Sequence, residues 1–72
     1  MNMEIQDFFK SLYNDLEHAK NTKTLKLLRK YASKRVAKEL SIDNISITYK
    51  KELQTSYKRF VKALKLAQKK LK

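Results

Sequence analysis

The 72-residue sequence contains no glycine and no proline. These two residues mark tight turns and helix ends, so a chain without them can make few sharp turns. The length fits a single domain, residues 1–72, with a small core. Because cysteine is also absent, disulfide bonds, thiolate chemistry and cysteine-ligated metal sites are excluded.

The first set of apolar residues follows the period of an α-helix. Its members are Ile5, Phe8, Phe9, Leu12, Tyr13, Leu16 and Ala19. Their spacing places them on one helix face. Glu4 and Asp7 suit the positive end of the helix dipole, and Lys20 falls at the last turn. We therefore predict a helix near residues 3–20.

A second apolar set predicts a helix near residues 23–41. Its members are Leu25, Leu28, Ala32, Val36 and Leu40. On a helix they lie within a sector of about 120°. Thr22 and Thr24 are both candidate N-caps. Arg35 and Glu39 are spaced for an i,i+4 ion pair.

The third apolar set is the most regular and predicts a helix near residues 47–71. Its members form a heptad seam: Leu53, Tyr57, Phe60, Leu64, Ala67 and Leu71, widened by Tyr49 and Val61. Such a seam packs inside a bundle or against a second copy. The bundle core is favoured, because free-standing coiled coils usually sustain more heptads. The expected fold is all-α, a small antiparallel three-helix bundle.

The stretch between the second and third helices is the least regular. Residues 45–49 alternate like a short strand, but no second strand is available to pair with them. We expect a loop whose isoleucines plug the end of the core. Its last polar residues, Asp43, Asn44, Ser46 and Thr48, are all candidate caps for the third helix.

A minor alternative for this region is a helix-turn-helix unit over residues 36–47. Ala37 would lie where the helices cross, Ser41 in the turn, and Ile42 and Ile47 in a small core. The turn position often holds glycine, and lysines at positions 50 and 51 break the expected apolar pattern.

Charge is unevenly distributed along the chain, which carries a net charge of +11. Residues 1–19 are acidic, with Glu4, Asp7, Asp15 and Glu17 opposed only by Lys10. The second and third helices are strongly basic. Self-repulsion of this size destabilises a compact state unless a polyanion relieves it. Nucleic acid is therefore the first partner to consider, and an anionic membrane surface the second.

Two basic ridges are the candidate nucleic-acid-binding site. The ridge on the third helix lies opposite the seam, within a sector of about 80° at about 100° per residue. It comprises Lys51, Lys58, Lys62, Lys65, Lys69 and Lys72, and is flanked by Arg59 and Lys70. The ridge on the second helix comprises Lys23, Lys26, Lys30 and Lys34.

The residue types favour contacts to phosphates over the reading of bases. Lysine is a flexible point charge that suits phosphates, whereas the planar fork of arginine reads guanine. A lysine-rich face often serves only solubility, but that purpose needs a net charge magnitude of about 2–8. Tyr31 is the best candidate for stacking on a base, although packing of Tyr31 and Leu27 between helices is the favoured alternative.

No catalytic constellation is visible. His18 is the only histidine, and no second metal ligand of suitable spacing accompanies it. Without glycine there is no phosphate-binding loop of the Walker or Rossmann kind. We expect no enzyme activity, cofactor, metal or small-molecule substrate.

The leading interpretation is a small lysine-rich nucleic-acid-binding protein, for DNA more than RNA, with weak sequence specificity. One alternative is a basic accessory subunit of a larger nucleic-acid enzyme such as a DNA polymerase. Its acidic first helix, or the Leu53/Tyr57/Phe60/Leu64 seam, would face a larger protein or a second copy. A membrane-surface module is another, weakened by the absence of tryptophan. With no apolar run of spanning length and no visible secretory signal, we expect a cytoplasmic protein.

Overall fold

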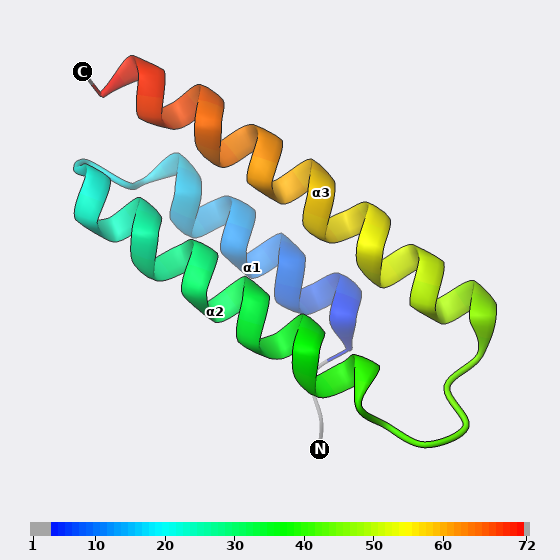
Figure 1. The fold of residues 1–72 in the computed structure, drawn as a ribbon. Coiled ribbons are helices and arrows are strands. Elements are labelled where there is room, and N and C mark those ends of the chain that lie inside the picture. The colour runs from blue at the N-terminus through cyan, green and yellow to red at the C-terminus, as the bar shows by residue number, and fades with distance from the viewer. Residues whose placement is uncertain (1–3, 72) are drawn as a thin grey trace.

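The computed structural model describes residues 4–71, which form three helices and no strand within that range. Helix α1 spans Ile5–Glu17, α2 spans Thr22–Leu40 and α3 spans Ile47–Lys70. Consecutive helices run in opposite directions, and each helix packs against both others (Figure 1). The bundle measures 43 × 23 × 15 Å along its principal axes. The predicted small antiparallel three-helix bundle is therefore confirmed.

Helix α1 ends earlier than its apolar spacing predicts. The backbone N–H of His18 donates to the carbonyl oxygens of Asn14 and Asp15, at 3.3 and 3.2 Å, so the last turn tightens and closes there. Lys20 lies beyond this turn, and its predicted place in the helix is wrong. The predicted start at residue 3 lies outside the described residues.

Helix α2 begins at an asparagine cap. The side-chain oxygen of Asn21 accepts hydrogen bonds from the backbone N–H of Thr24, at 2.9 Å, and from the Thr24 hydroxyl, at 3.1 Å. The prediction of a threonine cap is wrong, because asparagine precedes Thr22 and is among the most favourable N-cap residues.

The turn between α2 and α3 uses two of the polar residues that were considered as caps. Asn44 adopts a left-handed backbone conformation with φ of 63°, which asparagine tolerates better than most residues and which supplies a reversal without glycine. The hydroxyl oxygen of Ser46 accepts a hydrogen bond from the backbone N–H of Tyr49 at 3.1 Å. Ser46 is therefore the N-cap of α3.

The isoleucines of this turn do not behave alike. Ile45 is half-buried and packs against the core. Ile42 is 52% exposed and Ile47 is 74% exposed. The expectation that the isoleucines plug the end of the core is therefore correct for Ile45 and wrong for the other two.

The helix-turn-helix alternative is wrong. Helices α2 and α3 lie side by side and antiparallel (Figure 1), whereas that motif needs helices crossing at about 90–120°. Ala37 is exposed instead of lying at a helix crossing, and Ile42 and Ile47 form no small core.

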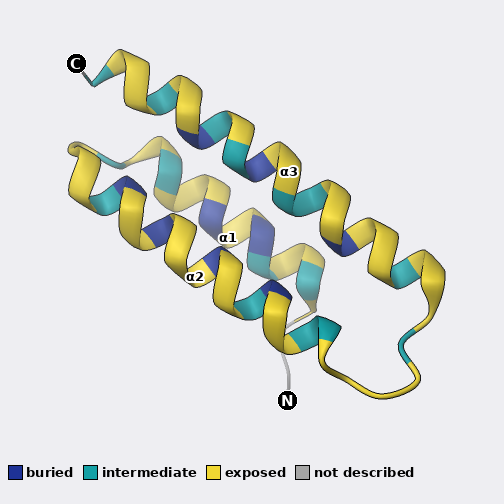
Figure 2. Cartoon of the chain, in the orientation of Figure 1, coloured by how far each residue is buried: buried dark blue, intermediate teal, exposed yellow. Residues whose placement is uncertain are grey.

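The core lies where the apolar faces of the three helices meet (Figure 2). Its buried residues are Phe9, Leu12, Leu25, Leu28, Ala32, Val36, Leu53, Phe60 and Leu64. Phe60 is completely buried, and its ring lies edge-on to Phe9 and Tyr13, with centroid separations of 6.1 and 5.3 Å. The heptad seam therefore lies inside the bundle, as favoured.

Arg35 connects the helices at one side of the bundle. Its guanidinium carbon lies 5.2 Å from the centre of the Phe8 ring on α1. Its Nε lies 3.2 Å from a carboxylate oxygen of Glu39, which confirms the predicted ion pair. Partial burial of Tyr49 on α3, together with the negative charge of Glu39, raises the Tyr49 pKa above its ordinary value of 10.0.

Candidate nucleic-acid interface

The lysine ridge of α3 is exposed along the described part of the helix. Lys51, Lys58, Lys62, Lys65 and Lys69 all have exposed side chains. They turn away from the core because the heptad seam occupies the opposite side of α3. Lys72 lies outside the described residues, so its place in the ridge is not described.

The ridge of α2 is also exposed, but it does not border a single groove. Lys23, Lys26, Lys30 and Lys34 all have exposed side chains. Lys26 borders α3, whereas Lys34 lines a groove between α1 and α2 together with Asp15. The four lysines therefore cross the outer surface of α2 from one neighbouring helix to the other.

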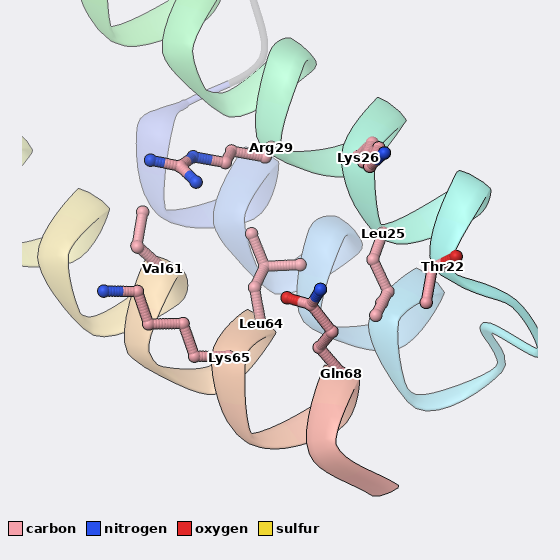
Figure 3. A pocket seen from close by; sticks show the side chains of 8 residues that line it. All are labelled: Thr22, Leu25, Lys26, Arg29, Val61, Leu64, Lys65 and Gln68. Atoms are coloured by element: carbon pink, nitrogen blue, oxygen red, sulfur yellow. The ribbon is translucent and has the colours of Figure 1, made fainter. Parts of the chain in front are cut away.

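A groove between α2 and α3 brings parts of both ridges together. Its volume is about 190 Å³, and Figure 3 shows its lining residues: Thr22, Leu25, Lys26, Arg29, Val61, Leu64, Lys65 and Gln68. Arg29 and Lys65 extend on either side of Val61 (Figure 3). The floor is apolar because Leu25 and Leu64 are core residues, and the cationic side chains lie at its edge.

A second groove adjoins the first along the same two helices. Its volume is about 320 Å³, and its lining residues are Arg29, Tyr57, Lys58, Val61, Lys62 and Lys65. Arg29, Val61 and Lys65 line both grooves. The two grooves together are called the α2–α3 groove below. No aspartate or glutamate within residues 4–71 lines either part of it.

Arg29 is the one cation lining this groove, within residues 4–71, that the sequence did not indicate as a binding residue. On α2 it lies toward the apolar stripe that holds Leu25 and Ala32, and outside the lysine ridge. The spacing of residues gives the angle of Arg29 around α2, but it does not give the side on which α3 packs. The position of Arg29 beside the apolar stripe of α2 could have indicated that it borders a neighbouring helix. Long cationic side chains often lie at the edge of a buried face and keep their charge in water.

Of the predicted site residues that the structure describes, only Lys26, Lys58, Lys62 and Lys65 line the α2–α3 groove. The others lie away from it: Lys23, Lys30, Lys34, Lys51, Arg59 and Lys69. Arg59 and Lys51 line a different groove, between α3 and α1, which they share with Glu52 and Gln6. A carboxylate beside cations lowers the positive potential available to a phosphate. The basic groove is therefore narrower than the two predicted ridges on both helices, and on α2 it includes Arg29 in place of Lys23, Lys30 and Lys34.

The acidic residues of α1 lie outside the α2–α3 groove, whose lining comes from α2 and α3 alone. Asp7, Asp15 and Glu17 are exposed on α1. Asp15 lines the α1–α2 groove, and Glu17 lines a groove between α1 and α3. The bundle therefore separates its negative helix from its most positive groove.

Tyr31 and Leu27 are exposed on α2, at 54% and 48%. The favoured interpretation, that they pack between helices, is wrong. Tyr31 lines the α1–α2 groove beside Phe8, Lys34 and Asp15. Tyr31 therefore offers an aromatic surface in that groove, but the carboxylate of Asp15 in the same groove would repel a phosphate.

The lone histidine has a local structural contact. The Nδ1–H of His18 donates to the carbonyl oxygen of Asn14, with a separation of 2.9 Å. Across residues 4–71, the histidine and carboxylate side chains form no cluster of three or more that would hold a metal ion.

No protein family, no curated protein and no solved structure is significantly similar to this chain. Within residues 4–71, no helix combines the length and the apolar character that crossing a bilayer requires.

Proposed function

We propose that this protein binds nucleic acid by placing phosphates along the α2–α3 groove. One observation carries the proposal: Arg29, Lys58, Lys62 and Lys65 line a shared groove that contains no carboxylate within residues 4–71. Like charges that line one groove repel one another, and a polyanion in the groove relieves that repulsion. DNA is the first ligand to test.

The proposed mode of binding is contact with the backbone and weak sequence preference. Four of the five cations that line the α2–α3 groove are lysines, which suit phosphates as flexible point charges. Phosphate contacts fix the position of a protein on nucleic acid but carry no sequence information directly. Unrelated oligonucleotides of equal length should therefore bind within about tenfold of one another.

The test compares two variants of equal net charge. The groove variant is Arg29→Gln with Lys58→Gln, Lys62→Gln and Lys65→Gln. The control variant is Lys10→Gln with Lys20→Gln, Lys38→Gln and Lys70→Gln, four exposed positions that do not line the α2–α3 groove. Fluorescence anisotropy measures the affinity of each for a labelled oligonucleotide, and circular dichroism checks the helices.

The groove variant should lose most of its affinity, and the control should lose far less. Equal losses would mean that net charge alone drives binding. Full affinity in the groove variant would contradict the proposal.

A basic accessory subunit of a larger nucleic-acid enzyme, such as a DNA polymerase, is the second candidate. It is favoured by a groove between α1 and α3 that displays Tyr13 and Leu66, which are 39% and 56% exposed. Exposed apolar side chains that share a groove are typical of protein interfaces. Stoichiometric co-purification of such an enzyme, resistant to nuclease and lost in Leu66→Gln, would support this role.

A further inference from the structure

The wall of the α2–α3 groove contains more than cations. Tyr57 and Val61 line it between the positively charged side chains, and both are half-buried. Tyr57 packs against the core on one side, and both residues line the groove between the cationic side chains. A site built only to contact phosphates has no need of an aromatic wall.

A groove with both cations and an aromatic side chain is expected to bind single-stranded and duplex nucleic acid differently. A duplex keeps its bases stacked inside and presents phosphates at its surface, so Tyr57 would gain nothing from it. A single strand has unstacked bases, which stack on aromatic side chains while basic residues hold the backbone. The guanidinium of Arg29 offers a second planar surface at the same groove.

We infer that the α2–α3 groove binds single-stranded nucleic acid, with a base against Tyr57 and phosphates on Arg29, Lys58 and Lys62. The inference rests on the proposed nucleic-acid binding and names the form of ligand. Tyr57 acts as the stacking residue. Tyr31 is less suited to that role, because its groove also contains Asp15.

The first measurement compares one oligonucleotide of about 12 nucleotides, a length that a small single-strand-binding domain covers, free and annealed to its complement. A duplex carries the higher density of phosphate charge. Electrostatics alone therefore favours the duplex, and stacking favours the single strand. The single strand should bind at least as tightly as the duplex at physiological salt. Tighter binding of the duplex would overturn the inference.

The second measurement uses matched tyrosine variants. Tyr57→Leu keeps an apolar side chain in the groove and removes the aromatic face, whereas Tyr13→Leu makes the same change on α1, in a different groove. Tyr57→Leu should weaken single-strand binding by about fivefold or more, leave duplex binding within about twofold, and keep the circular dichroism spectrum. Tyr13→Leu should leave both affinities within about twofold.

Equal effects of the two tyrosine variants on single-strand binding would overturn stacking at Tyr57. The groove variant separates that failure from failure of the proposed function. If it loses affinity for both ligands while Tyr57→Leu does not, phosphate binding stands and the single-strand inference fails. If it binds both ligands as the wild type does, the proposed function fails as well.

Discussion

Arg29 on α2 and Lys65 on α3 line both parts of the α2–α3 groove, and Val61 lies between them (Figure 3). The two cations come from different helices, and only the antiparallel packing of α2 on α3 brings them to one groove. The same packing keeps the acidic residues of α1 out of that groove. The fold thus concentrates a charge that the sequence distributes over two helices.

Arg29→Gln should weaken nucleic-acid binding more than Lys23→Gln does. Arg29 lines both parts of the groove, whereas Lys23 is an exposed residue of the α2 ridge that lines neither. Loss of one phosphate contact should reduce the magnitude of the salt slope by about 0.7–0.9. The measurement is anisotropy at several salt concentrations. A larger effect of Lys23→Gln would mean that the outer surface of α2 is the contact surface.

Asn21→Ala should destabilise the protein by about 0.5–2 kcal/mol, because it removes the side chain that caps α2. Asn21→Ser should retain most of the stability, since serine is also a good N-cap. Urea denaturation measures both free energies of unfolding. If Thr22→Ala costs as much as Asn21→Ala, the cap has been assigned to the wrong residue.

These caps illustrate what the sequence determines and what it leaves open. The apolar periods of Leu25 and Leu53 predict the helices and their inward faces, because burial imposes the helical repeat. Several adjacent residues can cap a helix with similar free energies, so Asn21 was not distinguishable from its threonine neighbours. The tertiary packing decides which helix lies beside each side of α2 and α3, and the residue spacing does not reveal it. For this reason the sequence did not predict that Arg29 and Tyr57 share a groove.

Phe60→Ala should destabilise the protein by about 3–5 kcal/mol, the usual cost of removing a large buried aromatic side chain. Phe60 is completely buried against Phe9 and Tyr13. Leu66→Ala is the control, since Leu66 is 56% exposed and should cost about 0.5 kcal/mol or less. Thermal and urea denaturation measure both. Similar costs for the two variants would contradict the described core.

Tyr49 should make stability depend on pH above its ordinary pKa of 10.0. Burial and Glu39 raise its pKa in the folded state, so its contribution is complete below pH 10 and is lost as pH rises through the folded pKa. Deprotonation of the many lysines in the same range affects wild type and Tyr49→Phe alike. The stability of the wild type relative to Tyr49→Phe should therefore fall with rising pH. A constant difference would contradict the shift.

The salt dependence of binding tests the central claim most directly. If Lys26, Arg29, Lys58, Lys62 and Lys65 each contact a phosphate, log affinity for a single strand should fall against log salt with a slope of about −3.5. In the groove variant, which retains only Lys26 of these cations, the slope should approach about −0.7, and the control variant should keep the wild-type value. The same slope in both variants would contradict the α2–α3 groove as the nucleic-acid interface.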